Sequence, residues 1–371
     1  MNVLVLTQQY PNKDDLYRNG FVHTRVKKYL EVNDDISIKV FVISKENKMS
    51  TYFYDGIEVV SGNGDLLIDY VMNQKIESMF IHFLLESMVK PLLDTRIKNI
   101  PKRIWVHGYE ALSWKRRLFN GIDKYFFYNI YKNEKQLKSF RNFVLSSINS
   151  KFIFVSEWMK NIAEEDMKVV FEDSVIIPNG IDTDYYFYED KKLLKKNILL
   201  IRPFNSRKYA TDIATEAILL LSKEDIFNDL KFTIVGEGKY LEKDIAKIQE
   251  FNNVKIIPKF VDKTEIRELH KKNGIFLCPT RQDAQGVSMC EAMSSGLVPI
   301  TSNNTAIPEF VSEEEGYLCE NANDLKNAIL DLQAVENIKS KSFASRNRII
   351  QKCELNNITI KELSLLNCEE F

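Results

Sequence analysis

Residues 197–204, NILLIRPF, are a short apolar run that begins a second series of such runs in the chain. The second series continues with KFTIVGEG (231–238), VKIIPKF (254–260), GIFLCPT (274–280) and LVPITS (297–302). An earlier series contains NVLVLT (2–7), IKVFVIS (38–44), RIWVHG (103–108) and KFIFVS (151–156). Helical stretches separate the runs, and this alternation is typical of a parallel sheet covered on both faces. The two series predict an α/β fold with two Rossmann-like domains that face a central cleft.

The predicted boundary between the domains lies in VIIPNGIDTDYY (175–186), where Pro178, Asn179 and Gly180 interrupt the pattern. We assign residues 1–182 to an N-terminal domain and residues 183–345 to a C-terminal domain. The remaining residues, 346–371, are predicted to form a helical tail that packs back toward the N-terminal domain.

The composition limits the function classes. The chain has 371 residues, enough for two domains, and its net charge of -1 argues against nucleic acid as a partner. Its five cysteines form no CxxC pair, which disfavours a zinc site or a disulfide framework and fits the cytoplasm. No apolar run reaches membrane-spanning length, so we expect a cytoplasmic protein or one held at the inner face of the cell membrane.

Two carboxylates flank a predicted helix start in RQDAQGVSMCEAMSSGLVPI (281–300). Asp283 lies in the preceding loop and Glu291 inside the helix. A helix N-terminus carries free N–H groups and partial positive charge, so it attracts phosphate. Phosphate next to carboxylates that bind hydroxyls suggests an activated sugar as the ligand.

Cations and glycines follow two other strands of the C-terminal half. Arg202 ends one predicted strand and Lys208 starts the next helix, where together they could hold a diphosphate. The alternative is that both are solvated loop charges. Gly236 and Gly238 in IVGEG could let the backbone approach a ligand closely, or could simply make a tight turn.

Histidines are few in this chain. His107 ends the run 103–108, where its side chain could face a ligand, although a histidine satisfied by the backbone is the alternative. Gly20 lies in the loop before the first predicted helix, and His23 just inside that helix. We interpret the stretches around His82 and His270 as amphipathic helices and both histidines as structural.

Four motifs, VIIPNGID, IRPFNSRKYA, IVGEG and DAQGVSMCEAMSSGLVPI, occur in this order and spacing. Together they resemble the family 4 retaining glycosyltransferases of the GT-B fold, strongly over residues 150 to 320 and loosely before. The resemblance implies that the N-terminal domain binds the acceptor and the C-terminal domain binds a nucleotide-sugar donor. Within the family, the Asp-x-Gln-Gly-Val-Ser pattern resembles enzymes that build bacterial polysaccharides.

The resemblance also implies roles for individual residues. The implied catalytic residues are His107, Arg202, Lys208 and Asp283. The implied donor-binding residues are Gly20, Gly236, Gly238, Gly286, Val287, Ser288 and Glu291. In this reading Asp283 contacts the transferred sugar, Glu291 binds the ribose, and Arg202 and Lys208 hold the diphosphate.

The sequence departs from the family pattern at several positions. Asp283 replaces the usual glutamate, Ala284 and Gln285 replace a glycine and an aromatic residue, and Tyr209 replaces a glycine. We expect these residues to line the donor site and to affect donor choice, since aspartate is one methylene shorter than glutamate.

These features predict a retaining hexosyl- or N-acetylhexosaminyltransferase that uses a glycan or lipid-linked acceptor in cell-surface polysaccharide or glycoconjugate synthesis. We expect no metal and no cofactor, because cations and a helix dipole can stabilise the leaving diphosphate. DTD (182–184) resembles a metal motif but lies in the boundary segment, and we interpret it as structural. The alternatives are a non-catalytic GT-B-shaped subunit that supports a partner glycosyltransferase, and an epimerase, for which acid and base residues are not evident.

Residues 114–141 contain eight Lys or Arg against two acidic residues, with aromatic residues between them. Such a segment could contact an anionic membrane through Trp114, Phe119, Phe126 and Phe127 and so meet a lipid-linked acceptor. The alternative is an ordinary amphipathic helix with solvated lysines.

Overall fold

The computed structural model describes residues 1–15, 18–146, 148–336 and 338–366 and divides them into two compact units. Unit 1 contains Met1–Leu118, Ile122–Pro178 and the chain from Asn356 onward, and unit 2 contains Phe119–Gly121 and Asn179–Leu355. The sequence placed the boundary at 182/183, and the structure changes units after Pro178. The end of the predicted tail, 367–371, lies outside the described residues together with Cys368.

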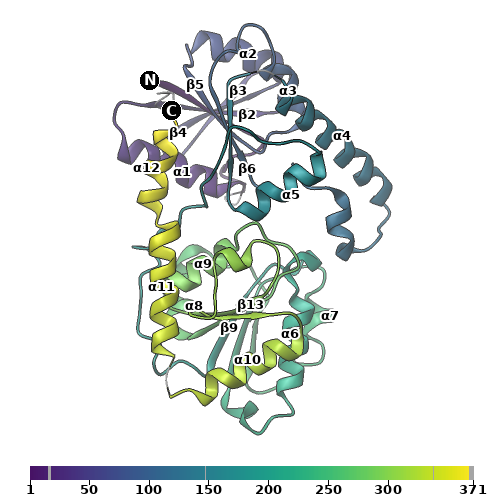
Figure 1. Cartoon of the computed structure of the whole chain (residues 1–371), viewed down its shortest axis with the longest axis vertical. Coiled ribbons are helices and arrows are strands. Elements are labelled where there is room, and N and C mark those ends of the chain that lie inside the picture. Colours follow the sequence, from purple (N-terminus) through teal and green to yellow (C-terminus); the bar gives the residue numbers. More distant parts are fainter. Residues whose placement is uncertain (16–17, 147, 337, 367–371) are drawn as a thin grey trace. The chain divides into compact units, whose positions relative to one another are not determined.

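Unit 1 is built on a sheet in the order β3-β4-β2-β1-β5-β6-β7-β8, parallel except for β3 (Figure 1). Its strands are β1 (Asn2–Thr7), β2 (Ser37–Ile43), β3 (Ser50–Tyr54), β4 (Ile57–Gly62), β5 (Ser78–His82), β6 (Lys102–Val106), β7 (Ser150–Phe154) and β8 (Ser174–Ile176). Its helices are α1 (Gly20–Val32), α2 (Gly64–Asn73), α3 (Glu86–Leu92), α4 (Phe126–Val144), α5 (Glu157–Met167) and α12 (Leu355–Ser364). The 3-10 helix η1 (Trp114–Asn120) precedes α4, and its last two residues are counted in unit 2. The direction of strand addition reverses between β1 and β5, which makes their carboxyl ends a switch point.

Side chains of successive residues in each strand point to opposite faces of the sheet. In β2, Val40 belongs to the core shared with α1 and α12, whereas the ring of Phe41 meets Tyr70 of α2 at 5.5 Å. Helices therefore cover both faces, which explains why the strands read as continuous apolar runs.

The terminal helix α12 is fixed to unit 1 by Glu362, which is 1% exposed. Its carboxylate accepts hydrogen bonds from Arg25 Nε (3.0 Å), Tyr29 Oη (2.6 Å) and Trp105 Nε1 (3.1 Å). A buried carboxylate with three donors is satisfied, and removal of a partner would leave a buried charge. This cluster gives α12 a defined position on unit 1.

Unit 2 contains a parallel sheet in the order β11-β10-β9-β12-β13-β14. Its strands are β9 (Asn197–Ile201), β10 (Lys231–Val235), β11 (Val254–Ile257), β12 (Ile275–Cys278), β13 (Val298–Ser302) and β14 (Tyr317–Cys319). Its helices are α6 (Thr211–Leu221), α7 (Leu241–Ile245), α8 (Lys263–Lys272), α9 (Val287–Ser294), α10 (Ala322–Ala334) and α11 (Lys339–Cys353), with the 3-10 helices η2 (Arg207–Tyr209), η3 (Asp225–Asp229) and η4 (Ile307–Glu309). The strand order reverses between β9 and β12, so the ligand crevice expected of such a sheet lies beyond their carboxyl ends.

The fold class predicted from the sequence is confirmed: both units are α/β with parallel sheets. One local prediction is wrong, because His82 is the last residue of strand β5 and not part of a helix. A buried strand and a buried helix segment both appear as apolar runs, and periodicity alone does not separate them. The helical placement of His23 in α1 and His270 in α8 is confirmed.

Candidate functional site

A cavity of about 370 Å³ lies at the switch point of the unit 2 sheet. Its lining includes six of the site residues that the resemblance implies, namely Arg202, Lys208, Gly236, Asp283, Val287 and Ser288. These residues come from the loops after β9, β10 and β12 and from the first turn of α9. Gly238, Gly286 and Glu291 adjoin this lining without being part of it. The lining also includes Tyr209, Lys259 and Phe260.

Arg202 is only 4% exposed, and hydrogen bonds hold its guanidinium at the cavity wall. Its Nη1 donates to Ser288 Oγ (2.7 Å) and its Nη2 to the Cys278 carbonyl (3.2 Å). The buried Nε atom has no hydrogen-bond partner among the described residues. A guanidinium fixed by these hydrogen bonds keeps its positive charge at the cavity wall, where it can attract an anion.

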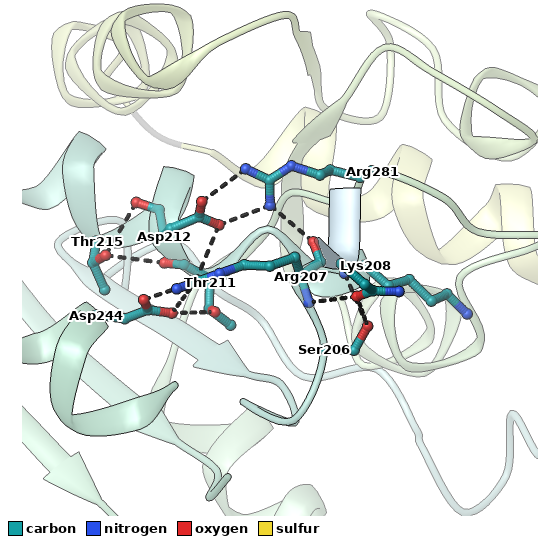
Figure 2. Close-up of polar contacts among 9 residues, drawn as sticks. Ser206, Arg207, Lys208, Thr211, Asp212, Thr215, Asp244 and Arg281 are labelled. Carbon is teal, nitrogen blue, oxygen red and sulfur yellow. Dashed lines mark hydrogen bonds and ion pairs between the residues drawn. The ribbon is translucent and has the colours of Figure 1, made fainter. Parts of the chain in front are cut away.

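Lys208 lies on η2 and lines the same cavity, and hydrogen bonds from residues 280 and 281 fix its main chain. Its carbonyl accepts hydrogen bonds from Arg281 N (2.8 Å) and Thr280 Oγ1 (3.0 Å). Its side chain points away from the acidic residues behind it (Figure 2). In the described part of the chain no carboxylate lies within ion-pair distance of Lys208 Nζ, which leaves its charge available to a ligand.

A network of charges behind Lys208 holds this loop (Figure 2). Arg281 binds Asp212 through two hydrogen bonds of 2.8 and 2.7 Å and also donates to the Arg207 carbonyl at 2.8 Å. The Arg207 side chain in turn binds Asp244 at 2.8 Å. Paired guanidinium–carboxylate contacts of this kind impose orientation as well as attraction. The sequence analysis missed this network, because only the fold brings residues 207, 212, 244 and 281 together.

Tyr209 lines the cavity, as expected of a departure at the donor site. Its ring lies 5.8 Å from the Arg202 guanidinium and 5.4 Å from Lys208 Nζ. An aromatic face attracts cations at such distances. Tyr209 therefore helps to keep the two positive charges at one side of the cavity.

Two glycines have a backbone reason to be glycine. Gly236 has φ +144°, and an added Cβ would lie 2.0 Å from the Arg202 carbonyl oxygen. Gly286, at φ +78°, precedes the first turn of α9 in the left-handed region that favours glycine. Gly236 is thus required by the neighbouring loop, which supports the tight-turn interpretation.

Asp283 lies at the mouth of α9, and part of its carboxylate is already used by its own loop. Oδ1 accepts from Gly286 N (3.0 Å) and Gln285 N (3.4 Å), and the Asp283 amide donates to Thr305 Oγ1 (3.1 Å). A short acidic side chain readily closes a loop onto the backbone two or three residues ahead. Asp283 therefore shapes the helix entrance in addition to lining the cavity.

Gln285 does not line the cavity, contrary to expectation. It is 1% exposed, and its amide binds Asn179 through the backbone N–H (2.6 Å), the side chain (2.8 Å) and the carbonyl (3.0 Å). Its amide nitrogen also lies 3.8 Å from Cys353 Sγ. This substitution ties the loop before α9 to the start of unit 2.

Glu291 lies one turn beyond Val287 on α9, on the same side of the helix as Val287 and Ser288. Burial raises the pKa of its carboxyl to about 7, although Lys263 and the Tyr186 hydroxyl partly oppose the rise. Burial disfavours the ionised form of this carboxyl, and hydrogen bonds donated by ligand hydroxyls would stabilise that form. Glu291 is therefore placed to accept hydrogen bonds beside the cavity.

His107 and Gly20 belong to unit 1. His107 follows β6, and its Nε2 lies 3.1 Å from Nδ1 of His82 at the end of β5. Burial lowers the pKa of His107 well below its usual value, and the nearby Arg25 adds to this effect. Gly20 is the first residue of α1. The adjacent ends of β5 and β6 thus bring two histidines together, of which the sequence singled out one.

Among the described residues, no group of three or more His, Cys, Asp or Glu side chains is arranged to hold a metal ion. None of the helices described has both the length and the apolar character needed to cross a bilayer. Asp182 of the DTD motif accepts a hydrogen bond from Tyr185 N (2.8 Å), which is a turn contact.

Comparison with known proteins agrees with this geometry. A family model described as "Glycosyl transferases group 1" matches residues 195–334, whereas no curated protein matches the chain. Sucrose-phosphate synthase from Thermosynechococcus elongatus is similar in structure, with TM-score 0.74, 12% identity and 98% of each chain covered. Anabaena Alr3699/HepE in complex with UDP and glucose is also similar, with TM-score 0.70, 14% identity and 100% of each chain covered.

A complex of S. aureus TarM with UDP, Fondaparinux and alpha-GlcNAc-glycerol gives TM-score 0.63 and 21% identity, over 82% of this chain and 59% of that one. Identities this low establish the fold alone, and the family match lies within the unit that contains the cavity. The chain therefore has the GT-B fold, and its residues 195–334 match the model of group 1 glycosyl transferases.

Proposed function

We propose that this protein is a retaining glycosyltransferase that moves a hexosyl or N-acetylhexosaminyl group from a nucleoside-diphosphate sugar to a glycan or lipid-linked acceptor. We further propose that the product is a cell-surface polysaccharide or glycoconjugate made at the cytoplasmic side of the membrane. Arg202, Lys208 and the first turn of α9 would hold the diphosphate, Glu291 the ribose, and Asp283 and His107 the transferred sugar.

The observation that carries the proposal is the placement of two cations at one cavity wall, neither of which has a carboxylate partner among the described residues. Arg202 and Lys208 both line the cavity, and the N-terminus of α9 lines it too. When the bond between sugar and diphosphate breaks, negative charge develops on the departing phosphate oxygen. Preorganised positive groups that meet this charge lower the barrier. The group 1 match of the same residues agrees with this assignment.

The reaction we propose needs no metal ion, since these cations and the helix dipole would serve the leaving group. The acceptor hydroxyl would attack the anomeric carbon on the face that the diphosphate leaves, and its proton would pass to a departing phosphate oxygen. The anomeric configuration would then be retained. NMR of the product linkage tests this stereochemistry.

A non-catalytic subunit is the second candidate, and Asp283 is the reason to keep it. Oδ1 of this carboxylate is bonded to backbone N–H groups at the entrance of α9. A shorter acid that closes its own loop has less capacity to bind sugar hydroxyls than a glutamate would have. Such a subunit would bind the nucleotide but would neither transfer nor hydrolyse the donor sugar.

The deciding experiment is a calorimetric and turnover screen of the purified protein against a panel of nucleoside-diphosphate sugars, with and without EDTA. Binding with slow hydrolysis that EDTA leaves unchanged would support the transferase and identify the donor. Binding without turnover, even with lipid-linked acceptors present, would favour the subunit. Turnover that EDTA abolishes would contradict the metal-free reaction.

Replacing Arg281 by alanine should reduce kcat about tenfold, since small displacements of a catalytic group are costly. The change removes the side-chain bonds to Asp212 and to the Arg207 carbonyl and so loosens the loop that carries Lys208. Nucleotide affinity should stay nearly constant. Lys326→Ala, which breaks the comparably exposed pair with Glu224, is the control. Equal losses in both variants would show that the Arg281 effect is general destabilisation.

Membrane contact is a further part of the proposal, and α4 with its preceding loop supports it. Ile122, Phe127 and Tyr131 are 78%, 82% and 65% exposed, and Tyr128 beside them is 55% exposed. Trp114 and Phe126, in contrast, pack on each other, and Trp114 Nε1 donates to Glu134. Exposed aromatic side chains within a basic segment match an anionic lipid surface.

The combined change Phe127→Ser, Tyr128→Ser and Tyr131→Ser should weaken binding to phosphatidylglycerol-containing vesicles about tenfold or more. Vesicle sedimentation at two salt concentrations measures this. Leu193→Ser, which removes a side chain from a position 90% exposed in unit 2, should leave binding unchanged. Undiminished binding of the triple variant would refute contact through α4.

A further inference from the structure

The end of β5 places a second histidine directly behind His107. His82 Nδ1 lies 3.1 Å from His107 Nε2, and the two rings stack with centroids 5.3 Å apart. His82 itself is fully buried and stacks on Trp105 at 4.9 Å on another side. Burial lowers the pKa of both histidines well below the usual value, so both rings are neutral at ordinary pH.

Two neutral imidazoles in this arrangement share one hydrogen atom, and two tautomer pairs are consistent with the distance. If His82 donates from Nδ1, then His107 accepts at Nε2 and carries its own hydrogen on Nδ1. If His107 donates from Nε2, then His82 must carry its hydrogen on Nε2. The state of His82 Nε2 therefore decides between the two pairs.

His82 Nε2 is buried and has no hydrogen-bond partner among the described residues. In the second arrangement this atom would be an N–H donor with nothing to bind, whereas in the first it is only an unused lone pair. Buried donors left without acceptors are rare in folded proteins, and acceptors left without donors are less so. The first arrangement is therefore favoured, with hydrogen on Nδ1 of both rings.

The surroundings of His107 also restrict its ring. Phe83 lies 4.4 Å and Phe21 4.9 Å from it, centroid to centroid. Phe83 adopts φ +61°, a backbone conformation that bulky residues rarely adopt and that is found at functional sites. No partner of His107 Nδ1 is present in the described part of the chain, and this nitrogen is not among the fully buried ones.

We propose that His82 is a positioning residue that donates its Nδ1 hydrogen to His107 and thereby fixes His107 as a hydrogen-bond donor at Nδ1. The ligand recognised at this nitrogen is then an oxygen acceptor, such as a hydroxyl of the transferred sugar. His107 would not act as a base. The role toward the sugar rests on the proposed function, but the tautomer does not.

Two substitutions of His82 separate positioning from packing. His82→Asn keeps an N–H donor close to the place of Nδ1 but leaves empty volume, whereas His82→Phe fills the space and has no donor. Positioning predicts that the asparagine variant retains most of kcat/KM and that the phenylalanine variant loses about tenfold, the lower end for residues that orient a functional histidine. A purely structural role predicts the reverse order.

The tautomers can be read directly by long-range ¹H–¹⁵N NMR of histidine-labelled protein, which contains only four histidines. We expect hydrogen on Nδ1 of His107 in the wild type and in His82→Asn, and a shift toward the Nε2 tautomer in His82→Phe. Hydrogen on Nε2 of His107 in the wild type would overturn the proposal. The expected tautomers in a protein that turns over no donor would sustain the His82–His107 inference and refute the proposed function.

Discussion

Replacing Lys208 by alanine is expected to lower kcat at least about a hundredfold, the usual loss when one group that stabilises developing charge is removed. Lys208 lines the cavity, no carboxylate in the described ranges pairs with its charge, and its backbone is held by Arg281 and Thr280. The negative charge on a departing phosphate is greater in the transition state than in the bound donor. The loss should therefore fall on kcat, with a smaller change in donor affinity.

Initial rates and calorimetric affinities, measured with the same donor, test this division. Lys239→Ala is the matched control, because Lys239 is an exposed lysine of unit 2 beside the ring of Tyr240 and does not line the cavity. Lys208→Arg should restore only part of the rate, since a guanidinium and an ammonium differ in shape and hydration. An unchanged kcat in Lys208→Ala would remove Lys208 from the reaction and weaken the transferase proposal.

The structure also explains which parts of this site a sequence can reveal. Arg202 and Lys208 could be predicted because they follow the apolar run of β9 within a few residues, and parallel strands bring their carboxyl ends to one edge. The clamp by Arg281 and Asp212 could not be predicted, since the two residues are 69 positions apart. Gln285 escaped prediction for the same reason, because its partner Asn179 is 106 positions away.

Unit 1 shows a different limit. Strand β5 has only five residues, all buried, within the longer apolar stretch 76–84. Such a stretch fits a buried strand or a buried helix equally well. For this reason the helix predicted around His82 is wrong, and the contact of His82 with His107 follows only from the pairing of β5 with β6.

Replacing Glu291 by glutamine is expected to weaken the binding of a nucleoside diphosphate about thirtyfold, since each hydrogen bond to a charged acceptor contributes about 1.5–3 kcal/mol. Glutamine preserves shape but cannot become an anion. Calorimetry at pH 8, where the Glu291 carboxyl is mostly ionised, gives the largest difference. Wild-type affinity in this variant would refute contact between Glu291 and the ribose.

The pH dependence offers a sharper measurement, because the pKa of Glu291 is raised to about 7 in the protein without ligand. At pH 7 about half of the molecules carry a proton on this carboxyl. Ribose hydroxyls that donate to the ionised form would lower the pKa and release that proton. Calorimetry in buffers of different ionisation enthalpy measures the release. The nucleotide's own phosphate contributes equally in both proteins, so the excess of wild type over Glu291→Gln isolates Glu291.

The raised pKa of Glu291 also makes the stability of the fold depend on pH. The folded protein holds the Glu291 proton more tightly than the unfolded chain does. The contribution of this group to stability is therefore fully present below about pH 4.5 and is lost as pH rises through about 7. For this partly buried carboxyl the loss should be about 2 kcal/mol, and Glu291→Gln should not show it. The variant should therefore melt above the wild type at pH 8 and gain less from nucleotide. If the difference in melting temperature between wild type and Glu291→Gln is instead the same at pH 5 and pH 8, the Glu291 carboxyl is already ionised before nucleotide binds. Binding should then release no proton from Glu291.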